Sequence, residues 1–168
     1  MSPMMSQASV AVFLQGLGAL SEILAKAGQH AEARKIDPAV LVGARLYPDM
    51  FPVSRQVQIA ADFAKGTVAR LAGREPPKWT DDETTLDQLR ERIARTIAYI
   101  REIPTAEIDA GATRDVTITM RGEPTTFAGP VYLFHFATPN FWFHVTTTYA
   151  ILRHNGVEVG KRDFMGKF

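Results

Sequence analysis

The sequence predicts a mainly α protein, an antiparallel bundle of four helices with a small β-hairpin before the last helix. Several long segments repeat apolar residues at intervals of three and four, which is the spacing of one helical face. One short segment, between Arg114 and Phe127, instead alternates apolar and polar residues, as a strand does. The 168 residues match one ordinary domain and contain no long linker, so we expect a single domain over residues 1–168.

The first helix is predicted from Ser6 to His30. Its apolar face is formed by Val10, Phe13, Leu14, Leu17, Leu20 and Leu24. Gly16 and Gly18 lower its intrinsic helix propensity, so this helix depends on tertiary packing. Asp37 and Pro38 then predict the N-cap and first position of a short helical turn.

The second and third helices are also predicted from start and stop signals. Asp49 ahead of Pro52 predicts the start of a helix that ends at Gly73. A polar loop over Glu75–Glu83 follows. Thr85 with Gln88 forms a capping box for the third helix, and Pro104 ends it. The two apolar faces comprise Val53, Val57, Ala60, Ala64, Thr67 and Leu71, and then Leu86, Leu89, Ile93, Ile97 and Ile100.

The last predicted elements are the hairpin and a helical region from Pro130 to Gly156. Gly122 predicts the turn of the hairpin, and Asn155 followed by Gly156 is a strong helix stop. Thr138 and Pro139 resemble a fresh N-cap and first helical position, so we expect the last helical region to be interrupted there.

Composition excludes several classes of function. The chain has no cysteine, which excludes disulfides, thiolate metal sites and a cysteine nucleophile, and favours the cytoplasm. A formal charge of +1 argues against nucleic acid as a partner. No apolar run approaches the length of a membrane span, and the start lacks a signal-peptide pattern, so we expect neither membrane insertion nor export.

Candidate site residues are polar side chains at inward positions of apolar faces. His144 lies on the face of Phe141, Val145 and Leu152, and Asn140 lies one turn before it. Gln56 interrupts the apolar face of the second helix. A buried imidazole needs a hydrogen bond or a metal, so we expect these three to converge on one polar pocket. Half of the sixteen aromatic residues lie between Phe127 and Tyr149, which predicts a core or a subunit contact.

The segment FWFHVTTTYAILRHNG, from Phe141 to Gly156, resembles the last helix of the DinB/YfiT-like superfamily. RLYPDM at 45–50, Gln56 with Val57, PNF at 139–141 and GKRDF at 160–164 resemble an uncharacterised bacterial family within it. The resemblance implies an up-down-down-up four-helix bundle, often dimeric. It also implies relatives that bind a divalent metal through three histidines. Here His144 matches one histidine, whereas Asn140 and Gln56 stand where the others belong.

Three functions compete at this point, and whether the protein is an enzyme stays open. The first is a non-catalytic or small-ligand-binding bundle with a degenerate metal site, whose pocket is formed by Gln56, Asn140, His144 and Tyr149, with Asp49 nearby. The second is a metal-dependent hydrolase or thiol-dependent transferase that holds Zn²⁺ or Ni²⁺ through His144 and His135, with Asp49 as a third ligand. The third is an interaction module that uses the aromatic last helix. We expect a homodimer.

Overall fold

The computed structural model describes residues 4–167. Its long helices are α1 (Val12–Arg34), α3 (Val53–Leu71), α4 (Leu86–Glu102) and α7 (Thr138–His154). Its short helices are α2 (Pro38–Val42), α5 (Thr105–Asp109), α6 (Gly129–Val131) and α8 (Lys161–Met165), and a 3₁₀ turn covers Ala110–Thr113. Two π-helical segments, Gln7–Ala11 and Tyr132–Ala137, lead directly into α1 and α7. The fold is therefore mainly helical, as predicted.

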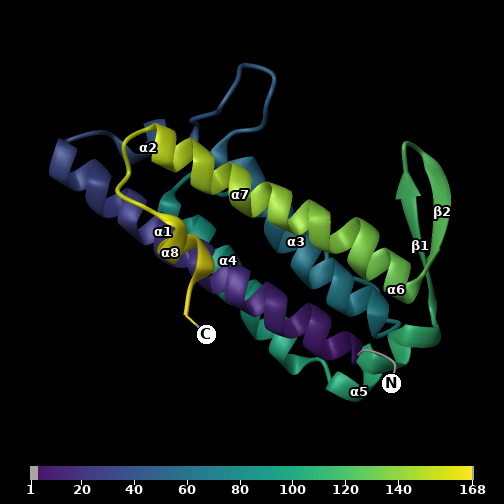
Figure 1. Cartoon of the computed structure of the whole chain (residues 1–168). Helices are drawn as coiled ribbons and strands as arrows, with labels where there is room; N and C mark the ends of the chain where they lie inside the picture. Colours follow the sequence, from purple (N-terminus) through teal and green to yellow (C-terminus); the bar gives the residue numbers. More distant parts are fainter. Residues whose placement is uncertain (1–3, 168) are drawn as a thin grey trace.

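The four long helices lie side by side, and the hairpin projects from one end beside α6 (Figure 1). Helix α3 packs against α7 and α4, and α1 packs against α4, α7 and α8. Their apolar faces form one continuous core. Burying each large side chain of such a core stabilises the fold by about 1.5–3 kcal/mol.

Close approach between α1 and α7 depends on Gly16. A Cβ atom at this position would lie 2.6 Å from a ring carbon of Phe141. Phe141 is fully buried, and its ring meets that of Phe13 edge-on at 4.9 Å between centroids. The glycine that lowers helix propensity therefore gives room for an aromatic side chain at the centre of the core.

The helix Gln7–Arg34 is long and apolar enough to cross a membrane by length and composition. Its fully buried side chains, which include Leu17, Leu20 and Leu24, belong to the common core with residues of the other long helices. A core helix of this kind passes the same test of length and composition as a membrane span. Its packing accounts for its apolar character.

Two of the four predicted N-caps are confirmed. The Asp37 carboxylate accepts a hydrogen bond from the amide of Ala39, and Thr85 forms a capping box with Gln88. The predicted cap at Asp49 is wrong. Pro52 occupies the N-cap of α3 in an extended conformation, and Asp49 lies exposed in the preceding turn. Proline suits this end of a helix because an amide hydrogen there would have no intrahelical acceptor.

The predicted hairpin is confirmed as an antiparallel pair, β1 (Asp115–Met120) and β2 (Glu123–Ala128). Its two turn residues, Arg121 and Gly122, have φ values of 52° and 87°, as a type I′ turn requires. Gly129 then lets the end of the hairpin meet the 3₁₀ turn. A Cβ there would lie 1.9 Å from the carbonyl oxygen of Gly111, so no side chain fits.

The last helix is not interrupted at Thr138 and Pro139, contrary to the prediction. Both Ala137 and Thr138 have helical backbone angles, and the chain passes from the π-helical segment into α7 without a break. Proline removes the amide hydrogen that would bond to the carbonyl four residues earlier. A wider helical turn just before it accommodates that loss without ending the helix.

Candidate functional site

The first candidate site is a hydrogen-bonded pair between α3 and α7. His144 Nδ1 lies 2.7 Å from Oε1 of Gln56, and Gln56 Nε2 donates to the carbonyl oxygen of Phe51 at 3.1 Å. Both side chains are buried, and His144 is 8% exposed. The structure thus brings together two of the predicted site residues, 88 positions apart in the chain.

The hydrogen bonds of Gln56 define the state of the imidazole. Because the amide nitrogen faces Phe51, the amide oxygen faces His144 and can only accept. His144 therefore carries its hydrogen on Nδ1, and Nε2 keeps a lone pair. Burial lowers the pKa of His144 to about 4, with a further contribution from the charge of Arg55. The imidazole is neutral at physiological pH.

Aromatic rings surround this pair. Phe63 of α3 stacks on the His144 ring at 6.0 Å, and Phe143 meets it edge-on at 5.2 Å. The stacking continues from Phe63 to Phe136 at 5.8 Å. Phe143 is 57% exposed, so the pair lies below an apolar surface of α7. Such a surface suits an apolar ligand or a protein partner.

Asn140 and Tyr149 do not join the pair, contrary to the predicted pocket. Asn140 Nδ2 donates to the carbonyl oxygen of Phe136, within its own helix, at 2.7 Å. The ring of Tyr149 packs on Phe164 of α8 at 5.9 Å. Tyr149 follows His144 by five residues, which turns it away from α3 and toward the side of α7 covered by α8.

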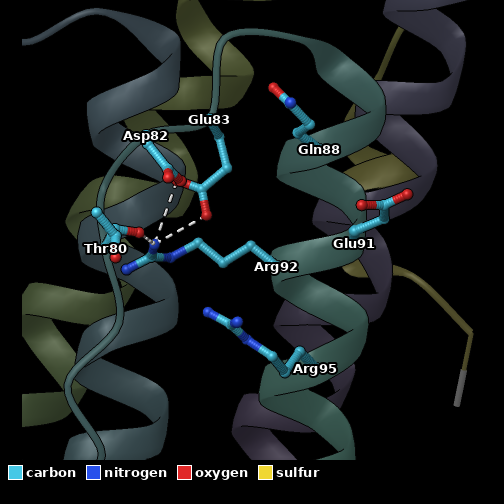
Figure 2. Close-up of a pocket in the computed structure, with 7 residues that line it drawn as sticks. All are labelled: Thr80, Asp82, Glu83, Gln88, Glu91, Arg92 and Arg95. Atoms are coloured by element: carbon cyan, nitrogen blue, oxygen red, sulfur yellow. Dashed lines mark hydrogen bonds and ion pairs between the residues drawn. The ribbon is translucent and has the colours of Figure 1, made fainter.

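A second candidate site, absent from the sequence predictions, surrounds Arg92 of α4. Its side chain is fully buried at 0% exposure. Its guanidinium contacts Asp62 of α3 at 2.9 Å, and then Asp81 at 2.7 Å, Glu83 at 2.9 Å and the Thr80 carbonyl oxygen at 3.0 Å in the loop between α3 and α4. Figure 2 shows the guanidinium pointing at Glu83 and at the loop backbone. Arg92 therefore holds this loop against both helices.

The surroundings of Arg92 are polar and hollowed. A surface cavity of about 390 Å³ is lined by Thr80, Asp82, Glu83, Gln88, Glu91, Arg92 and Arg95 (Figure 2). Nε of Arg92 is buried and has no hydrogen-bond partner among the described residues. The sequence does contain one signal for this residue, because Arg92 lies three residues after Leu89 and four before Thr96, both of them buried. A charged residue on an apolar face predicts a buried ion pair.

Comparison with known proteins identifies the family. The model of the family described as "Domain of unknown function (DUF1993)" matches residues 5–165. The chain belongs to the DUF1993 family.

A solved relative of this DUF1993 protein is known. The crystal structure of a DinB family member protein from Shewanella denitrificans, at 1.83 Å resolution, is similar over nearly the whole chain. The two sequences are 42% identical, the TM-score is 0.92, and the match covers 99% of this chain and 94% of that one. No curated protein matches the chain. The match supports the DinB-like resemblance inferred from the motifs.

The residues of this DUF1993 protein do not fit the three-histidine metal site that the superfamily resemblance implies. His144 is buried, whereas His135 is exposed, and Asp49 is exposed before α3. The amide oxygen of Gln56 already accepts the hydrogen of His144 Nδ1. Within residues 4–167, no group of three histidine, aspartate or glutamate side chains could hold a metal ion. The predicted ligand set of His144, His135 and Asp49 is therefore not assembled.

Proposed function

We propose that this DUF1993 protein is a non-catalytic bundle protein in which the Gln56–His144 pair replaces the metal site of its superfamily. The four long helices would form the up-down-down-up bundle that the resemblance implies, within one domain. The hydrogen bond between His144 Nδ1 and Gln56 Oε1 carries this proposal. The resemblance places two metal-binding histidines at these two positions. A neutral, hydrogen-bonded pair stands there instead, and it needs no metal ion. Small molecules or proteins would then bind the apolar surface above it, in the cytoplasm.

The weakness of amide oxygens as metal ligands supports the same proposal. A neutral amide oxygen is a poor ligand for Zn²⁺ or Ni²⁺ compared with imidazole nitrogen. One histidine with two amides would hold such an ion weakly. The alternative, a metal-dependent hydrolase or thiol-dependent transferase, requires a third strong donor beside His144. Neither His135 nor Asp49 lies in a position to supply it.

Metal analysis tests the proposal. Protein purified without a nickel column is expected to contain far less than one transition-metal ion per chain. A chelator is expected to leave its melting temperature unchanged. Removing a metal lowers the melting temperature only when the folded protein binds that metal. A matched gain-of-site variant with Gln56→His and Asn140→His restores the superfamily pattern around His144. Zinc is expected to raise the melting temperature of this variant alone. Stoichiometric zinc or nickel in the wild-type protein would rule the proposal out.

We also propose that the exposed aromatic face of α7 forms a homodimer contact. Phe143 of α7 and Phe134 of the π-helical segment before it are both exposed, and aromatic residues are typical of interface centres. Light scattering at micromolar concentration is expected to give the mass of a dimer. Phe143→Glu is expected to give a monomer with an unchanged circular dichroism spectrum. Val40→Glu, at an exposed apolar position of α2, is the control and should leave the dimer intact. A monomeric wild-type protein would refute this contact.

A further inference from the structure

Lys65 of α3 occupies an unusual position for a lysine. Its side chain is 6% exposed. Its Nζ contacts the carboxylate of Asp62, one turn earlier, and lies 4.6 Å from the ring centroid of Trp79. Lysine is seldom buried unless it is paired, and this one is held between a carboxylate and the face of an indole ring.

The same side chain lines a surface cavity of about 400 Å³ between α3 and the loop that follows it. Its lining combines Pro76, Pro77 and Trp79 with the charged side chains of Asp62, Lys65, Arg70, Glu75 and Lys78. This volume falls within the range of small-molecule sites. Lys65 is therefore largely shielded from bulk water, and a small molecule bound in the cavity would lie beside its side chain.

Burial also changes the amine itself. Desolvation lowers the pKa of Lys65, although the hydrogen bond and charge of Asp62 act in the opposite direction. A larger fraction of this amine is therefore neutral at a given pH than for an ordinary lysine. Only the neutral amine is a nucleophile, and desolvated lysines of this kind form imines with carbonyl compounds.

We propose that Lys65 is a carbonyl-reactive amine that forms an imine with small aldehydes entering the cavity beside Trp79. Asp62 accepts a proton from the ammonium group, and the nitrogen lone pair then forms a bond to the carbonyl carbon. The carbonyl π-electrons move to oxygen, which takes up one proton from the attacking nitrogen and the one held by Asp62. Loss of this oxygen as water gives the C=N bond. The sum is one protonated amine and one aldehyde converted to one protonated imine and one water.

The charge of the product favours aldehydes over acyl donors as the compounds that react with Lys65. A protonated imine keeps the positive charge of the lysine, so Asp62 and the Trp79 ring continue to stabilise it. Acylation would remove that charge and leave Asp62 facing a neutral amide. Lys65 lies on α3, as Gln56 does, but its cavity faces the loop that follows this helix. The inference does not depend on the function proposed for the Gln56–His144 pair.

Reductive trapping of the imine tests this inference. The folded wild-type protein is treated with benzaldehyde and cyanoborohydride at neutral pH, and tandem mass spectrometry measures the benzyl adduct on each of the six lysines. Lys65 is expected to react at least about threefold faster than Lys78, an exposed lysine that lines the same cavity. The preference is expected to vanish in denaturing urea, because it depends on the folded surroundings.

Two outcomes would overturn the inference. One is a rate at Lys65 equal to or below that at Lys78 in the folded protein. The other is a preference for Lys65 that persists in urea, because it would then come from local sequence. The Lys65→Arg variant keeps a cation between Asp62 and Trp79. It is expected to lose the fast-reacting component of the wild-type protein while it keeps slow labelling at the other lysines.

Discussion

Replacing Arg92 with methionine is expected to lower the free energy of unfolding by about 3 kcal/mol, because the mostly buried carboxylate of Glu83 loses its partner. Arg92 is fully buried and contacts Asp62, Asp81 and Glu83. Methionine has a similar length and fills the space, so the loss measures the missing charge more than a cavity. Urea denaturation followed by circular dichroism gives this free energy.

Arg90→Met is the matched control for this experiment. Arg90 lies on the same helix, but its ion pair with Asp87 is long, at 3.7 Å, and both side chains reach solvent. Exposed pairs of this kind contribute about 0–1 kcal/mol. Limited proteolysis within residues 74–84 should also become faster in Arg92→Met alone, because the loop loses its attachment. Equal losses of stability in the two variants would contradict the role of Arg92.

Acidification from pH 7.5 to about pH 5 is expected to remove about 2 kcal/mol of stability through His144 alone. Burial holds the pKa of His144 at about 4, whereas an unfolded histidine titrates near 6.5. Between these values the unfolded chain binds the proton and the folded chain does not, so stability falls as the pH falls. The loss of stability begins as the pH falls through the pKa of histidine in the unfolded chain. It is complete only below the pKa of His144 in the folded protein.

His144→Asn isolates this contribution from other titrating groups. The asparagine amide nitrogen can replace Nδ1–H as the donor to Gln56, but it does not titrate. Urea midpoints of wild type and variant are compared at both pH values. The difference in urea midpoint between the two proteins is expected to shrink or reverse on acidification. The wild-type protein loses the stability that its neutral His144 contributes at pH 7.5, and the variant does not. A constant difference across this range would mean that His144 does not titrate as its burial requires.

Local patterns were sufficient for most of the fold. The apolar spacing of the long helices, the capping box at Thr85 and the turn at Gly122 all depend on residues within a few positions of one another. Such interactions depend on residues that are close together in the chain, so a local pattern can reveal them. Errors occurred where a tertiary contact or a neighbouring proline altered a local preference. Asp49 has a good capping side chain, but Pro52 is closer to the helix start.

The short C-terminal helix also shows the limit of prediction from local patterns. Residues 161–165 form α8, a helix that the local patterns did not predict. Asp163 accepts a hydrogen bond from Lys26 at 2.6 Å, and Phe164 packs on Trp142 at 5.4 Å. The hydrogen bond from Lys26 and that from the amide of Gly160 hold the pKa of Asp163 below its usual value. Lys26 and Trp142 lie far from α8 in the sequence, so no local pattern could reveal their contacts with it.

The sequence by itself determined that Gln56 and His144 occupy inward positions, because helical periodicity alone assigns each side chain to a face of its own helix. Only the tertiary structure decided which faces meet and at what height along the helices. It joined Gln56 to His144, left Asn140 bonded to its own helix, and turned His135 and Tyr149 elsewhere. It also gathered three carboxylates around Arg92. The physical reason is that periodicity gives the direction of a side chain only relative to its own helix. A site depends on how several helices lie relative to one another, and the packing of the whole core determines that arrangement.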